Sequence, residues 1–168
     1  MAKKTAYIGI LTALAVCLAW LERLIPLDAA VPGVKLGLSN TVTLITMHLF
    51  GGGCAFGVTA VRVLLTGAMY SGVSGIIYSA AGGFLSCAVM IGLKQTRFPT
   101  VIGVSIAGGV FHNIGQLLAA ALVVENAGIL YYLPILIVSG AAAGVVTGLC
   151  ARLALIAILK AFPPQKRS

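Results

Sequence analysis

The feature that most constrains this chain is a set of apolar runs, each long enough to cross a lipid bilayer. A membrane-spanning helix needs roughly 20 apolar residues, and four runs reach that length: residues 5–25, 71–93, 100–124 and 131–151. Charged residues make up 8% of the 168 residues, against about 25% in soluble domains. The sequence therefore predicts an all-α integral membrane protein that forms a single domain, residues 1–168.

The region from residue 36 to residue 69 decides the number of spans. It is too long for one helix and short for two, and three glycines, Gly51 to Gly53, lie in its middle. Cytoplasmic loops of membrane proteins are enriched in Lys and Arg, and two short helices, 36–50 and 54–69, satisfy that rule. Eight basic residues and no acidic residue then lie on the cytoplasmic side: Lys3, Lys4, Lys94, Arg97, Arg152, Lys160, Lys166 and Arg167. We therefore predict a compact bundle of six transmembrane helices with both termini cytoplasmic.

The net charge of +8 follows from the same topology. The outer side carries five charged residues that sum to −1: Glu22, Arg23, Asp28, Lys35 and Glu125. Arg62, inside the membrane, completes the total. The basic charge thus reflects orientation in the membrane, and we expect no nucleic-acid partner.

Polar residues at membrane depth predict a binding cavity. An ionisable group within the hydrocarbon costs several kcal/mol, so it usually faces the protein interior or an aqueous cavity. Arg62 lies near the middle of the third predicted span, and the segment FHNIGQ, residues 111–116, lies in the middle of the fifth. We expect a cavity with its floor near the midplane and its mouth toward the outer surface. Its lining would come from four spans and the first loop: Asn40, Arg62, Thr66, Tyr78, His112, Asn113, Gln116 and Lys35.

Arg62 indicates what such a cavity would hold. No acidic residue lies at its predicted depth, and the planar guanidinium suits a carboxylate or a phosphate. These residues therefore favour an anionic or phosphorylated small ligand. Two alternatives stay open. Arg62 could pair with Glu22 or Glu125 or bond to backbone carbonyls, and the polar residues of the fifth span could serve as hydrogen bonds between helices.

Small residues at four-residue spacing allow helices to approach closely in lipid. The strongest such ridge lies on the last span and consists of Gly140, Gly144 and Gly148. Two weaker ridges lie on the first span: Gly9 with Ala13, and Ala15 with Ala19. Each ridge is either an internal packing seam or a docking face for the helices of a partner.

Catalytic motifs are missing from the sequence. It has no G-x-x-x-x-G-K-[ST] P-loop for ATP hydrolysis and no acid-rich cluster to hold magnesium and a diphosphate. It has neither a G-x-S-x-G nor an H-E-x-x-H motif, and its four cysteines lack metal-ligand spacing. We therefore predict a binding protein rather than an enzyme, without a metal or other cofactor.

Five segments carry a resemblance to a known family: PGVKLGLSNTVTLITMHLFG, VRVLLTG, SGIIYSAAGGFLSCAVM, GVSIAGGVFHNIGQ and YYLPILIVSGAAAGVVTG. They resemble the family named heptaprenyl diphosphate synthase component I, also called the Gx transporter family. The resemblance covers about residues 5–160, and K-L-G-L-x-N and H-N-x-G-Q are its specific motifs.

That family is in turn similar to the substrate-binding S components of energy-coupling factor (ECF) transporters in size, helix number and first-helix pattern. The similarity implies a substrate-binding subunit in the bacterial cytoplasmic membrane. It would take an anionic, isoprenoid- or vitamin-related metabolite from the outer face, under a loop that carries Lys35. It also implies partners on separate chains, a transmembrane coupling subunit and ATPase subunits, docked at Gly9 and Ala13 or at Ala15 and Ala19.

The synthase name implies a different function, a part in building a long prenyl diphosphate. Elongation of prenyl chains needs aspartate-rich motifs that bind diphosphate through magnesium, and this chain has a single aspartate, Asp28. Under that name the protein would assist a catalytic partner. A third alternative is a scaffold of a membrane redox or biosynthetic complex.

Overall fold

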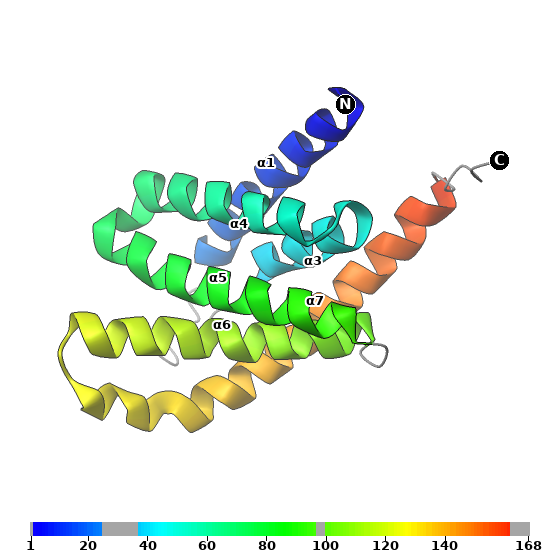
Figure 1. The fold of residues 1–168 in the computed structure, drawn as a ribbon. Helices are drawn as coiled ribbons and strands as arrows, with labels where there is room; N and C mark the ends of the chain where they lie inside the picture. Colours follow the sequence, from blue (N-terminus) through cyan, green and yellow to red (C-terminus); the bar gives the residue numbers. More distant parts are fainter. Residues whose placement is uncertain (1, 25–36, 97–99, 162–168) are drawn as a thin grey trace.

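The computed structural model describes residues 2–24, 37–96 and 100–161, which form a helical bundle (Figure 1). Its main helices are α1 (Ala2–Leu24), α3 (Leu38–Phe50), α4 (Gly52–Thr66), α5 (Gly72–Gln95), α6 (Val101–Val123) and α7 (Leu133–Ala161). Two short segments complete the bundle: a π-helical turn, η1 (Gly67–Ser71), and a 3-10 helix, η2 (Ala127–Tyr132). The described residues contain no β-strand, which confirms the predicted all-α fold.

Five helical stretches are long and apolar enough to cross a membrane: α1, α4 with η1, α5, α6, and η2 with α7. The protein is therefore a multi-pass membrane protein. The second predicted span, α3, is the exception, because its 13 residues extend about 20 Å, less than the roughly 30 Å of bilayer hydrocarbon. Six helices form as predicted, but one of them is too short to be a full span.

The short length of α3 follows from its central position. Every residue from Ser39 to Met47 is buried, and α3 packs against α1, α4, α6 and α7. Because protein rather than lipid surrounds this helix, bilayer thickness does not set its length.

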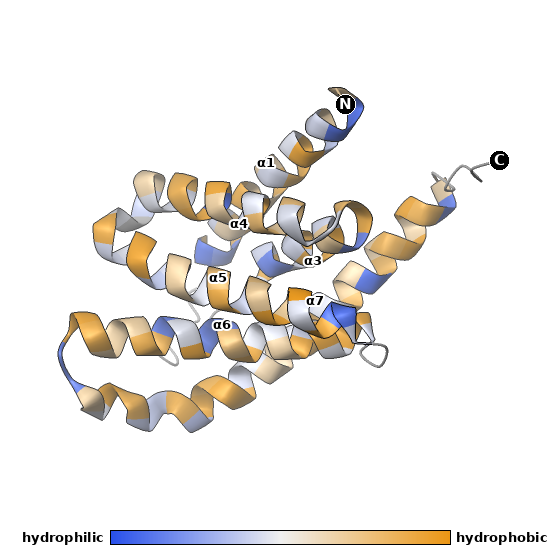
Figure 2. Cartoon of the chain, viewed as in Figure 1, coloured by the Kyte–Doolittle hydropathy of each residue, from blue (hydrophilic) through white to orange (hydrophobic). Residues whose placement is uncertain are grey.

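The helices form two layers (Figure 1). Helices α4, α5 and α6 lie side by side in one layer, α1 and α3 lie behind them, and α7 starts beside α6 and then passes behind it. The start of α1 and the end of α7 lie toward the same end of the bundle, where the labels N and C stand. The helix bodies are mostly apolar, and hydrophilic positions lie near helix ends and at a few places within the bodies, among them α6 (Figure 2).

The glycine ridge of the last span is an internal packing seam between α6 and α7. A Cβ atom added to Gly144 would lie 2.5 Å from the Cα atom of Ile106, and one added to Gly140 would lie 2.8 Å from the carbonyl oxygen of Gly109. Contacts this close leave no room for any side chain. The ridge is thus covered by α6 of the same chain. It is an internal packing seam and not a docking face for the helices of a partner.

The opposite side of α6 packs just as closely against α5. A Cβ atom added to Gly115 would lie 2.6 Å from the carbonyl oxygen of Ala81. Small residues therefore let α6 approach both of its neighbours, as is usual where lipid supplies no hydrophobic drive for helix association. The segment FHNIGQ therefore lies in a helix that is closely packed on two sides.

The two small-residue pairs of α1 differ in environment. Ala15 is fully buried and packs with Val42 and Val58, and it is the one buried residue of this helix. Gly9 and Ala13 are exposed. The remaining residue of the second pair, Ala19, is half-buried. Only the Gly9 and Ala13 pair therefore presents an open surface.

Candidate functional site

Arg62, in the middle of α4, is the central residue of the predicted site. Its side chain is buried, with 6% of its surface exposed. The Nη1 atom donates a hydrogen bond to the Oγ atom of Ser39, in the first turn of α3. The Nε and Nη2 atoms have no hydrogen-bond partner among the described residues. Arg62 therefore brings a positive charge to the start of α3 through Nη1, while two of its other donor atoms have no partner in the part of the chain that the structure describes.

Glu22, in the last turn of α1, places a negative charge near Arg62. Its carboxylate interacts electrostatically with the guanidinium of Arg62. Its Oε1 atom also accepts a hydrogen bond of 2.5 Å from the backbone N–H of Gly37, the residue that precedes α3. The sequence offered Glu22 and Glu125 as possible ion-pair partners of Arg62. The structure places Glu22 near it.

Arg62 packs closely against residues of α3, α4 and α5. A Cβ atom added to Gly83 of α5 would lie 3.2 Å from the Nη2 atom of Arg62, so the lack of a side chain there gives the guanidinium its room. The hydroxyls of Thr43 and Thr59 lie 3.3 Å apart beside it. Thr66 uses its hydroxyl within α4, donating to the carbonyl oxygen of Arg62 at 2.8 Å. Thr66 thus has no donor directed toward a ligand.

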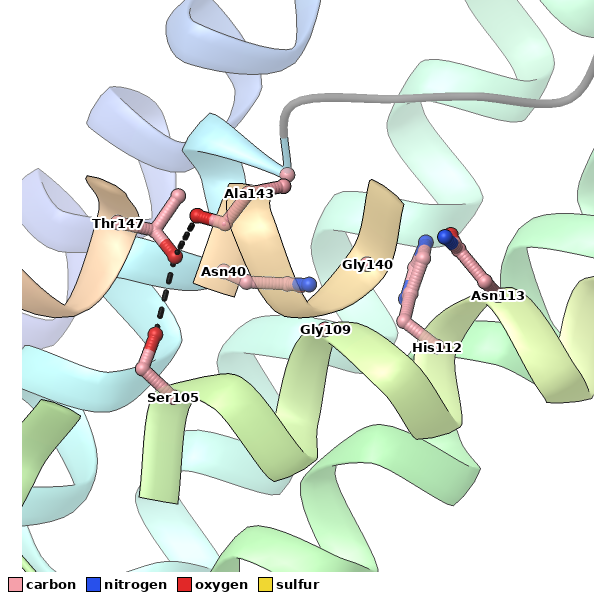
Figure 3. Close-up of a pocket in the computed structure, with 9 residues that line it drawn as sticks. Asn40, Ser105, Gly109, His112, Asn113, Gly140, Ala143 and Thr147 are labelled. Atoms are coloured by element: carbon pink, nitrogen blue, oxygen red, sulfur yellow. Dashed lines mark hydrogen bonds between the residues drawn. The ribbon is translucent and has the colours of Figure 1, made fainter. Parts of the chain in front are cut away.

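A separate small crevice lies between α3, α6 and α7 (Figure 3). It is lined by Gly37, Asn40, Ser105, Gly109, His112, Asn113, Gly140, Ala143 and Thr147. Asn40 extends from α3 toward the region between Gly109 and Gly140, and His112 rises from α6 beside it. The crevice has a volume of about 10 Å³, room for about one water molecule. Pockets for metabolites usually measure about 300–1,000 Å³, so this crevice is not a preformed substrate pocket.

Two side-chain contacts show what the polar residues of α6 do in this structure. Asn113 donates from Nδ2 to the carbonyl oxygen of Leu136 in α7 at 2.8 Å. One end of the crevice is closed by Ser105 and Thr147, whose hydroxyls lie 2.9 Å apart. Hydrogen bonds of this kind hold helices together in lipid. For Asn113, the structure therefore matches the alternative of an interhelical hydrogen bond.

The other predicted residues lie apart from this cluster or cannot be placed. Gln116 is half-buried, and its Cγ atom would lie 2.6 Å from a Cβ atom on Gly82 of α5. Tyr78 is half-buried on α5. Lys35, with the loop expected to cover the cavity, lies outside the described residues. The structure thus joins Asn40, His112 and Asn113 in the crevice and places Arg62 with Ser39 next to it.

Sequence reasoning missed the two crevice residues that carry hydroxyl groups, Ser105 and Thr147. Ser105 lies seven positions before His112, and Thr147 lies seven positions after Gly140. Positions seven apart share a helix face, so the helical period could have identified both. Their hydroxyls escaped notice because Ser and Thr are common in transmembrane helices and carry no charge.

Comparison with known sequences places the chain in a family. Residues 11–154 match the family described as heptaprenyl diphosphate synthase component I, whereas no curated protein matches the chain. The matched region contains α3 to α6 completely, with Arg62 and the whole FHNIGQ segment. Because the match extends over most of the chain, the protein belongs to the heptaprenyl diphosphate synthase component I family.

Proposed function

We propose that this chain is a non-catalytic membrane component that assists a separate catalytic chain in building a long prenyl diphosphate. The family match over residues 11–154 carries the proposal. The multi-pass fold fits it, because a polyprenyl product is too apolar to leave the membrane. A membrane partner would keep the catalytic chain at the bilayer surface.

The acidic residues of the chain support a non-catalytic role. Magnesium that binds a diphosphate is held by carboxylates, and this chain has one aspartate, Asp28, and two glutamates, Glu22 and Glu125. The described residues contain no group of three His, Cys, Asp or Glu side chains that could hold a metal ion. Prenyl transfer would then be performed by the partner.

The orientation that we propose places both chain ends on the cytoplasmic side of the bacterial cytoplasmic membrane. The start of α1 and the end of α7 lie toward the same end of the bundle (Figure 1). Lys3 and Lys4 belong to the start of α1, and Lys94 to the last turn of α5. Glu22 and Glu125 lie at helix ends that point the other way. Basic residues on one side and acidic residues on the other support this orientation under the positive-inside rule.

A second candidate function is that of an ECF-type substrate-binding subunit for a small anionic or phosphorylated metabolite, with a coupling subunit and ATPases as partners. The two unused donors of Arg62 favour it. Two observations weigh against it: the crevice has a volume of about 10 Å³, and the carboxylate of Glu22 already interacts with Arg62. The synthase component therefore remains the better supported function.

The test is chain elongation in membranes of the native host with and without this gene. Membranes receive radiolabelled isopentenyl diphosphate and an allylic diphosphate primer, and the lengths of the products are measured. We expect long-chain product to fall sharply without the gene and to return when the wild-type chain is re-expressed. Unchanged product lengths in the deletion strain would reject the proposal. Lost uptake of a metabolite with normal prenyl products would favour the transport function instead.

A further inference from the structure

We propose that the end of α7, from Arg152 to Ala161, is the surface on which the catalytic chain docks; this inference rests on the proposed function, which names that partner. The partner surface that fits it is an apolar groove with acidic residues on its rim. Three features of α7 support this: how far it extends past its neighbours, which of its faces stays exposed, and which charges lie on that face.

The packing register with α6 shows how far α7 extends. A Cβ atom added to Gly148 of α7 would lie 2.9 Å from the Cα atom of Ile102 in α6. Four residues earlier in α7, Gly144 faces Ile106, so the two helices run antiparallel. Ile102 belongs to the first turn of α6, and α6 therefore begins level with Gly148. Helix α7 continues beyond that level through residues 149–161, about 20 Å along its axis.

The other neighbours end at the same level. Gly115 of α6 faces Ala81 of the antiparallel helix α5. The same number of residues separates Gly115 from the start of α6 and Ala81 from the end of α5, so these two helix ends coincide. Lys94, in the last turn of α5, donates to the carbonyl oxygen of Met47 near the end of α3 at 2.5 Å. The end of α7 accordingly projects past the ends of α5 and α6 (Figure 1).

The projecting end of α7 is too long to be covered by lipid headgroups. Bilayer hydrocarbon is about 30 Å thick, and headgroups add only about 5–8 Å on each side. Helix α6, with 23 residues, extends about 35 Å and so already crosses the hydrocarbon. Because α7 is one uninterrupted helix from Leu133 to Ala161, its end cannot bend down onto the lipid surface. The last turns of α7 therefore stand in water.

This end of α7 has two different faces. Ala151 and Leu155 are buried in an apolar cluster with residues of α3. The opposite face carries Leu153, Ile156 and Leu159, with 67%, 53% and 48% of their surface exposed. These three side chains form an aliphatic ridge. A ridge of this kind in water is typical of a surface that another protein covers.

Two basic residues border the aliphatic ridge. Arg152 and Lys160 are both exposed, and each lies four positions from Ile156, so all three share one helix face. Protein interfaces commonly have an apolar centre with a polar rim, and a helix presents such a face to a groove on its partner. Carboxylates on the rim of the groove would complement the two cations.

The first test is a photocross-link from the full chain in membranes of the native host. The cross-linking residue benzoylphenylalanine replaces Ile156 in one variant and Val138 in the control. Val138 has 70% of its surface exposed and lies on the part of α7 that runs alongside α6. We expect the Ile156 variant to cross-link a prenyl diphosphate synthase, identified by mass spectrometry, and the Val138 variant not to do so. Equal cross-linking from both positions, or lipid adducts alone from Ile156, would overturn the proposal.

The second test measures how much prenyl-elongation activity sediments with the membranes. Leu153→Ser with Ile156→Ser shortens the ridge, and Val138→Ser with Val146→Ser is the matched control on the same helix. We expect the ridge variant to retain at least about tenfold less activity in the membrane pellet and the control to behave like the wild type. SDS unfolding verifies that both variants fold.

The charges are tested by Arg152→Gln with Lys160→Gln, which leaves the apolar ridge intact. We expect this variant to release elongation activity from the membranes at a lower salt concentration than the wild type, because the rim charges then no longer contribute. Activity that stays attached in both the ridge variant and the charge variant would contradict the docking surface.

The docking surface and the proposed function fail in different ways. Unchanged product lengths after deletion of the gene would reject both. Loss of long-chain product after deletion, combined with normal attachment of the activity in the ridge variant, would reject the docking surface alone.

Discussion

The substitution Gly144→Ala places a side chain in the seam between α6 and α7, and we expect it to lower the stability of the protein. A Cβ atom at this position would lie 2.5 Å from the Cα atom of Ile106 and 2.8 Å from the carbonyl oxygen of Ser105. Carbon atoms pack at about 3.5–4.0 Å, so the two helices must separate by about 1 Å. Both facing atoms belong to the backbone and cannot rotate away, so no rotamer change relieves the clash.

The expected loss of stability combines three contributions. Overpacking costs about 1–3 kcal/mol, and we take about 3 because backbone faces backbone. The hydrogen bond between Ser105 and Thr147, at 2.9 Å in the same seam, would lengthen beyond its range, which costs about 0.6 kcal/mol in a membrane. Alanine is the better helix former by about 1 kcal/mol. The net destabilisation is therefore about 2.5 kcal/mol.

The measurement is unfolding of the full chain by SDS in mixed micelles, followed by circular dichroism. Gly57→Ala in α4 is the matched control, because a Cβ atom there has no neighbour within 4 Å. We expect G57A to be as stable as the wild type or slightly more stable. If G144A unfolds at the same SDS fraction as G57A, the seam is not as close as described, and the reasoning fails.

Two further predictions concern the polar residues and the topology. Asn113→Leu removes the hydrogen bond to the carbonyl oxygen in α7 and should lower the free energy of unfolding by about 0.6–1.7 kcal/mol; a neutral effect in the same SDS assay would show that Asn113 does not hold the helices together. Cysteines introduced as Lys3→Cys and Glu125→Cys, in a chain whose native cysteines are replaced by serine, should react with a membrane-impermeant maleimide from opposite sides. Right-side-out vesicles should label only the second, and labelling of both from outside would contradict the orientation.

Much of the architecture could be predicted from apolar runs alone. The predicted helices at 71–93 and 100–124 agree with α5 and α6 to within a few residues, because only a helix satisfies its backbone within hydrocarbon. Beyond the last predicted span, 131–151, the sequence leaves two alternatives, an extension of the helix or a segment along the inner surface, and the structure shows the extension, because α7 continues to Ala161. The second was predicted as a short helix, residues 36–50, and counted as one of the six spans; α3 has 13 residues, and burial by its neighbours allows a helix of this length.

The site was less accessible to sequence reasoning. The polar character of Arg62 and of the FHNIGQ segment within apolar runs is visible in the sequence, and Arg62, His112 and Asn113 are in fact buried in the bundle. The residues that these side chains contact cannot be read from the sequence. Arg62 bonds to Ser39 and interacts with Glu22, and Asn113 bonds to the backbone carbonyl of Leu136 and to the hydroxyl of Ser139 in α7.

The sequence by itself determined that this protein lies in a membrane, where its helices run and which residues are too polar to face lipid. Each of these follows from the cost of transferring one residue or one run into hydrocarbon, which depends on local composition. Only the tertiary structure decided that the glycine ridge of α7 is covered by α6, that Gly9 and Ala13 stay open, and that a carboxylate of α1 reaches the start of α3. Lipid tails are as apolar as leucine side chains, so hydropathy does not distinguish a face that meets lipid from a face that meets another helix.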